Sequence, residues 1–169
     1  MHCTRCVNIR YMKRAVIIHC WDGYPDYCWY PYVKKELEAK GFEVQVPAFP
    51  ETDAPKLDAW LHVLKEKVGI PDGNTYLIGH SVGCITIFRY LESLAPGQKI
   101  GGVVLVAGFT DDLGFKELKN FFTTEIQIPK RAPGFNRLVV VIPTITMNQI
   151  FKVCARRFMR FEKYRGHLN

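Results

Sequence analysis

The segment of this chain best suited to catalysis is Gly79-His80-Ser81-Val82-Gly83, which lies between apolar runs at residues 75–78 and 85–91. Gly-x-Ser-x-Gly between a strand and a helix forms a nucleophile elbow, a tight strained turn that holds the serine hydroxyl above a sheet. Side chains at Gly79 and Gly83 would collide with neighbouring backbone. The helix after such a turn points its N–H groups at a developing oxyanion. The motif therefore predicts that Ser81 is a catalytic nucleophile.

The sequence patterns of strands and helices alternate before and after this turn, and these elements must hold it in position. Buried or alternating apolar runs predict strands at residues 15–19, 42–46, 75–79, 101–108 and 137–142. Helical spacing predicts helices at residues 29–37, 57–68 and 85–91, with a short one at 115–122. This order predicts an α/β fold with a mostly parallel sheet and right-handed crossovers. The loops after residues 19 and 79 should meet at the carboxyl edge, where such sheets place their sites.

Length and composition indicate one ordinary globular domain. The chain has 169 residues, of which 48% are hydrophobic and 23% charged. No apolar run approaches the ~20 residues of a bilayer span, and residues 1–11 lack the apolar core of a secretory signal. Four cysteines are predicted to be reduced core residues: Cys20, Cys28, Cys84 and Cys154. Cys3 and Cys6 have no second pair at zinc-ligand spacing, so we expect no metal, no cofactor and a cytoplasmic location.

The net charge of +7 is unevenly distributed along the chain. Residues 1–128 carry 14 Lys+Arg against 15 Asp+Glu, whereas residues 129–169 carry 9 against 1. A neutral body argues against nucleic-acid binding by the fold itself, and no membrane partner is expected. We predict three segments: a disordered extension at 1–11, a domain at 12–142 and a basic divergent tail at 143–169. The basic stretch at 151–161 fits a solvated tail, a substitute edge helix, or a nucleic-acid or membrane arm.

Several motifs together carry a family resemblance over roughly residues 12–128. They are the segments 16–23 (VIIHCWDG), 29–38 (WYPYVKKELE), 41–44 (GFEV), 79–83 (GHSVG), 103–106 (VVLV) and 110–114 (TDDLG). With these segments the chain resembles the small α/β-hydrolases of the retinoblastoma-binding serine hydrolase family. The resemblance implies a compact, flavodoxin-like three-layer fold and a Ser-His-Asp triad with Ser81 as nucleophile. It also implies oxyanion donors at the backbone N–H groups of Val82 and Trp21, with His19 supporting the loop that carries Trp21.

The C-terminal part departs from this family pattern. The family's acid should follow the fifth strand, but residues 142–146 contain none, and no aspartate lies beyond Asp112. The base would be His167, two residues before the last residue of the sequence. We therefore expect a domain whose C-terminus is truncated or frameshifted. Asp111 or Asp112 could supply the acid instead, although solvated loop carboxylates are the simpler interpretation.

Two functional hypotheses follow from the sequence. The first is a serine hydrolase that cleaves small carboxylic esters or amides through an acyl-Ser81 intermediate, with activity impaired if the triad acid is missing. The second is a non-catalytic protein-interaction module on the same scaffold. Either would be a monomer or a weak homodimer.

Overall fold

The computed structural model describes residues 12–126 and 138–141. Five parallel strands form one sheet in the order β2-β1-β3-β4-β5. They are β1 (Lys13–Ile18), β2 (Phe42–Gln45), β3 (Thr75–His80), β4 (Gly102–Val106) and β5 (Leu138–Val141). The predicted parallel sheet is confirmed, including its fifth strand. The predicted extension at 1–11 and tail at 143–169 lie outside the described residues.

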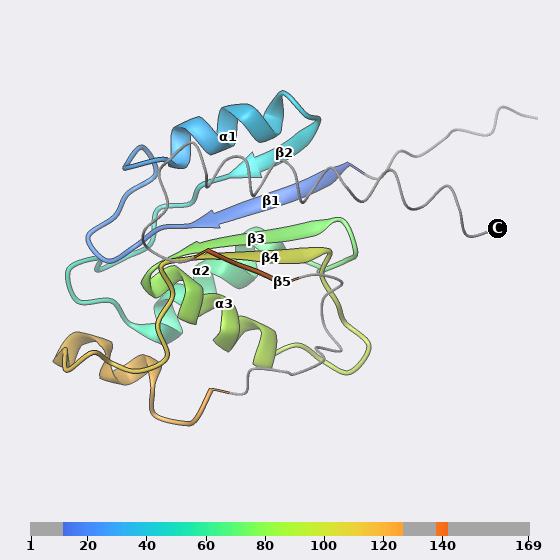
Figure 1. The fold of residues 1–169 in the computed structure, drawn as a ribbon. Coiled ribbons are helices and arrows are strands. Elements are labelled where there is room, and N and C mark those ends of the chain that lie inside the picture. The colour runs from blue at the N-terminus through green and yellow to red at the C-terminus, as the bar shows by residue number, and fades with distance from the viewer. Residues whose placement is uncertain (1–11, 127–137, 142–169) are drawn as a thin grey trace, which may run out of the picture.

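Helices cover both faces of the sheet and give the predicted three layers. The helices are α1 (Tyr30–Glu38), α2 (Leu57–Val68), α3 (Val82–Glu92) and a short 3-10 helix, η1 (Lys116–Phe121). α1 lies on one face, and α2 and α3 lie on the other (Figure 1). This arrangement follows from the two-residue repeat of strands, which turns alternate side chains to opposite faces. In β1, Val16 and Ile18 pack with α2 and α3, whereas Ala15 and Ile17 pack with α1.

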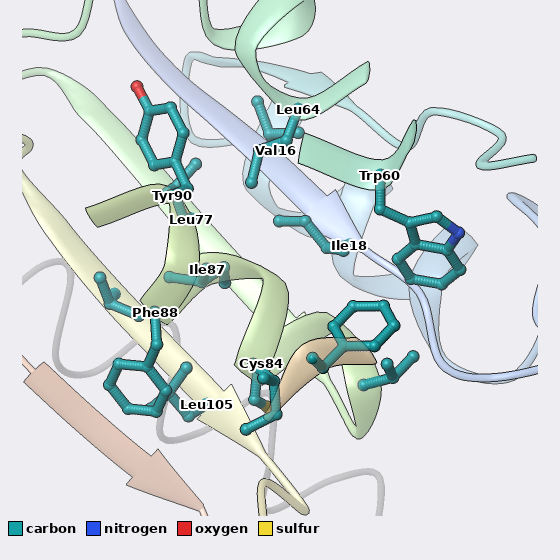
Figure 2. Close-up of a cluster of buried hydrophobic side chains, with 14 of the residues drawn as sticks. Val16, Ile18, Trp60, Leu64, Leu77, Cys84, Ile87, Phe88, Tyr90 and Leu105 are labelled. Carbon is teal, nitrogen blue, oxygen red and sulfur yellow. The ribbon is translucent and has the colours of Figure 1, made fainter. Parts of the chain in front are cut away.

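The larger apolar core lies between the sheet and the α2–α3 layer. Trp60 and Leu64 of α2 and Ile87 of α3 are fully buried there, and they surround Ile18 of β1 (Figure 2). Burying a large aliphatic or aromatic side chain contributes roughly 1.5–3 kcal/mol, so this cluster fixes α3 firmly against the sheet. The N-terminus of α3 is consequently held in one position relative to the strand ends.

Strand register brings three loops together at the carboxyl edge of the sheet. Ile18 at the end of β1 is paired with Gly79 of β3, and His80 of β3 is paired with Val106 of β4. The turns that follow these strands are therefore neighbours, as the sequence predicts. The segment containing η1 is held nearby by Asn120, whose side chain accepts a hydrogen bond from the Leu57 N–H at the start of α2 (2.7 Å).

The structure tests the predictions made for three of the cysteines and for membrane-spanning segments. Cys20 and Cys84 are buried as predicted, but Cys28 is exposed because it lies in the turn before α1, with a positive φ of 56°. Cys154, Cys3 and Cys6 lie outside the described residues. Within residues 12–126 and 138–141, no helix is long and apolar enough to cross a membrane.

Candidate active site

Ser81 occupies the turn between β3 and α3 in a strained backbone conformation. Its φ and ψ are 54° and −118°, a region that costs a non-glycine residue about 1–3 kcal/mol. Two backbone hydrogen bonds hold the turn: the Ser81 N–H donates to Val106 O, and Ser81 O accepts from the Cys84 N–H, both at 2.9 Å. The residue is only partly buried, and its side chain does not cap α3. The hydroxyl is therefore not committed to holding the helix together.

The two glycines of the motif allow very close backbone packing around Ser81. A Cβ at Gly79 would lie 2.8 Å from Cys84 N and from Gly83 O, which are fixed backbone atoms. A Cβ at Gly83 would lie 2.4 Å from Ile18 O. The predicted collisions are therefore present at both positions. Glycine at residue 83 lets the first turn of α3 press against the end of β1, beside the loop that carries Trp21.

The backbone N–H groups near this turn that have no acceptor among the described residues include those of Trp21 and Val82. The Val82 N–H belongs to the first residue of α3, where helix geometry leaves N–H groups unpaired. The orientation of the Trp21 N–H is set by the peptide group that it shares with Cys20 O. This carbonyl oxygen accepts hydrogen bonds from the Gly23 N–H (3.0 Å) and from His19 Nδ1 (2.9 Å). Because a trans peptide places C=O and N–H on opposite sides, these bonds turn the Trp21 N–H away from both donors.

His19 is fully buried and supports two loops through its ring nitrogens. Nε2 accepts a hydrogen bond from the Phe49 N–H (3.2 Å), so the ring proton lies on Nδ1 and is donated to Cys20 O. Burial lowers the pKa of His19, although the bond to Cys20 opposes this shift, and the ring is therefore neutral. Edge-on contacts with Phe49 and Trp60 complete its surroundings. These contacts fit the supporting role expected of His19.

His80 lies on the opposite face of the sheet from α3. Its ring contacts Trp29 and Tyr30 beside α1, and Nδ1 lies 2.8 Å from the Tyr30 hydroxyl. Burial lowers the pKa of His80 and favours its neutral form. This side chain is thus committed to packing on the α1 side.

A protein-family model described as serine hydrolase matches residues 15–144. The chain belongs to the serine hydrolase family. It is 35% identical over 111 residues to YdeN of Bacillus subtilis (strain 168), covering 66% of this chain and 58% of YdeN. It is 32% identical over 87 residues to the serine hydrolase RBBP9 of Rattus norvegicus, covering 51% of this chain and 44% of RBBP9. The chain thus spans about half the length of these relatives.

Solved structures agree with this assignment. The crystal structure of the ydeN gene product superposes with a TM-score of 0.70 at 28% identity, covering 87% of this chain and 81% of that one. An α/β-superfamily protein from Xanthomonas campestris pv. campestris gives a TM-score of 0.52 at 16% identity, covering 86% and 82%, which supports the fold alone. The family and fold predicted from the sequence are both confirmed.

In this family member, the remaining predicted site residues are only partly placed. His167 lies outside the described residues. Asp111 and Asp112 use their carboxylates to build a turn, accepting hydrogen bonds from the N–H groups of Leu113 (2.9 Å) and Gly114 (2.8 Å). No group of three His, Cys, Asp or Glu side chains arranged to hold a metal occurs in the described part of the chain.

Two polar residues make long-range hydrogen bonds that were not predicted from the sequence. Arg89 lies in an apolar helix run, yet its buried guanidinium donates from Nε to Phe121 O (2.9 Å) and ties η1 to α3. Tyr30 appears in the sequence as one more aromatic residue of the first helix, but its hydroxyl is hydrogen-bonded on both sides. Helical spacing reports which face is buried, and it contains no signal for these long-range polar bonds.

Proposed function

We propose that this chain is a serine hydrolase that cleaves small carboxylic esters or amides, with Ser81 as the nucleophile and the Val82 and Trp21 N–H groups as oxyanion donors. One observation carries the proposal: a serine held at φ 54° lies directly before the N-terminus of a helix, and the N–H groups of Val82 next to it and of Trp21 in the loop after β1 have no acceptor among the described residues. Such strain persists only where the surrounding structure enforces it, and it is concentrated at active sites.

The chemistry divides into two steps. Ser81 Oγ attacks the carbonyl carbon while its proton passes to a general base, and the carbonyl oxygen becomes an oxyanion that accepts hydrogen bonds from the Val82 and Trp21 N–H groups. Collapse of this intermediate breaks the ester or amide bond, and the leaving alcohol or amine takes the proton from the base. Water then attacks the acyl-serine by the same route and releases the acid. From the sequence, His167 is the candidate base.

Hydrolysis of p-nitrophenyl acetate tests the proposal. Wild-type protein should release p-nitrophenol faster than buffer alone. Ser81→Ala should retain only the small acceleration that substrate binding and the oxyanion donors provide without the nucleophile. Removing the serine of a complete triad lowers kcat by roughly 10⁶-fold. A wild-type site that already lacks one triad member accelerates hydrolysis only ~10³–10⁴-fold over water, so the loss would be smaller. Equal rates for wild type and Ser81→Ala would overturn the assignment of Ser81.

The alternative function is a non-catalytic interaction module on the same scaffold. A folded wild-type protein that neither hydrolyses esters nor forms an acyl-enzyme would favour that function. We further propose a cytoplasmic monomer or weak homodimer that binds neither nucleic acid nor membrane, consistent with the near-neutral charge balance of residues 1–128. Sedimentation of the full chain at several concentrations tests the oligomeric state.

A further inference from the structure

The buried hydroxyl of Tyr30 contacts both the loop after β1 and the last residue of β3, next to the proposed oxyanion site. Tyr30 is the first residue of α1 and is fully buried. Its oxygen accepts a hydrogen bond from the Cys20 N–H (2.9 Å) and lies 2.8 Å from Nδ1 of His80. Cys20 directly precedes Trp21, and His80 directly precedes Ser81. One side chain on the α1 face therefore contacts the neighbours of both the proposed donor and the proposed nucleophile.

The direction of these hydrogen bonds can be assigned from the chemistry of the groups. A backbone N–H only donates, so the Tyr30 oxygen is the acceptor for Cys20 and its own proton is available for His80 Nδ1. Burial raises the pKa of Tyr30 well above its usual value, which keeps the phenol protonated. Burial also lowers the pKa of His80, which favours the neutral imidazole with Nδ1 free to accept.

Cys20 is consequently held at both ends of its backbone. Its N–H is bonded to Tyr30, and its C=O is bonded to His19 and Gly23. These contacts fix the two backbone dihedral angles of Cys20, and those angles decide where the next N–H, that of Trp21, points. Without the hydroxyl, only the carbonyl contacts of Cys20 restrain this segment, so the Trp21 N–H is held less firmly.

The geometry points to Tyr30 as a positioning residue that orients the Trp21 N–H toward the oxyanion formed at Ser81. Tyr30 does not touch the reacting atoms; it acts through Cys20 and His80. This inference rests on the proposed function for its catalytic consequence, while the orientation of the loop is measurable without any activity.

Tyr30→Phe removes only the hydroxyl, and Tyr27→Phe is the matched control because it removes a hydroxyl from a neighbouring, more exposed ring. Loss of a whole oxyanion donor lowers kcat by ~10²–10³-fold, so its misorientation in Tyr30→Phe should lower kcat for p-nitrophenyl acetate by about 10–100-fold. KM should stay within about twofold, since the donor acts in the transition state. A kcat within twofold of wild type, or equal losses in Tyr30→Phe and Tyr27→Phe, would overturn the inference.

Amide hydrogen exchange measured by NMR separates this inference from the proposed function. In wild type, the Cys20 amide should exchange at least ~10²-fold more slowly than the Trp21 amide, because only the first is hydrogen-bonded. In Tyr30→Phe, that protection should be lost and the Trp21 amide resonance should shift. If wild type is inactive but these changes occur, the hydrolase proposal fails and the positioning role stands. Equal exchange of the two amides in wild type would overturn the positioning role even if Tyr30→Phe does not fold.

Discussion

Replacing Gly83 with alanine should push the first turn of α3 away from the end of β1. The new Cβ would lie 2.4 Å from Ile18 O and 2.9 Å from His19 O, whereas ordinary contact begins at 3.4 Å. The shortfall against Ile18 is 3.4 − 2.4 = 1.0 Å, and both opposing atoms belong to the backbone of a buried strand end. Neither can rotate aside as a flexible side chain could, so the helix start itself must move by about 1 Å.

Two consequences of this movement can be given a magnitude. Overpacking of this kind costs about 1–3 kcal/mol, and the better helix propensity of alanine returns up to about 1 kcal/mol. We therefore expect the free energy of unfolding to fall by up to about 2 kcal/mol. Ser81 and the Val82 N–H precede Gly83 directly and should shift with it, and a displacement of about 1 Å costs on the order of 10²-fold in rate.

Urea denaturation and p-nitrophenyl acetate hydrolysis measure the two effects of Gly83→Ala separately. Gly73→Ala is the control, because a Cβ at Gly73 meets no atom within 4 Å and its φ is not positive. That control should change stability by less than about 0.5 kcal/mol and leave the rate unchanged. If Gly83→Ala matched wild type in both stability and rate, the close approach of α3 to β1 would not be what holds Ser81 in place.

Three further predictions concern backbone strain, pH and thiol reactivity. Ser81→Gly should be more stable to urea than Ser81→Ala by about 1 kcal/mol, because glycine adopts φ 54° without strain; equal stabilities would contradict this. His19 has a lowered pKa in the folded protein, so the unfolded chain binds more protons as pH falls below about 6.5, and the free energy of unfolding should drop by up to ~1.4 kcal/mol per pH unit. Urea titrations at pH 7.5 and 5.5 should show a smaller drop in His19→Gln but an unchanged one in the exposed-site control His62→Gln. Among the described cysteines, exposed Cys28 should react with a disulfide reagent in the native protein, whereas Cys84, buried and with a pKa raised to about 12, should react only after unfolding; rapid labelling of Cys84 would contradict the structure.

Much of the fold was predictable because buried residues of strands and helices follow simple apolar patterns in the sequence. Strands covered on both faces become continuous apolar runs, and the covered face of a helix repeats about every 3.6 residues. Gly79 and Gly83 were predictable for a related reason, since only glycine permits the backbone contacts at those positions. The turn around Ser81 was therefore predictable from the spacing of these glycines.

Features that depend on contacts between distant segments were not predictable in the same way. The Tyr30 hydroxyl meets partners 10 and 50 residues away, and Asn120 caps α2 across 63 residues. The prediction that Cys28 is a core residue, made from its apolar neighbours, was wrong because Cys28 lies in an exposed turn with a positive φ. The predicted base, His167, stays a prediction, since it lies outside the described residues.

Covalent labelling by a fluorophosphonate probe shows directly whether Ser81 is a nucleophile, because the probe requires an activated serine and oxyanion donors but no particular substrate. The full chain should gain one phosphonyl group, and peptide mass spectrometry should locate it on Ser81. Ser81→Ala should remain unlabelled under the same conditions. Labelling at another residue, or no labelling of folded wild-type protein, would contradict Ser81 as the nucleophile of this chain.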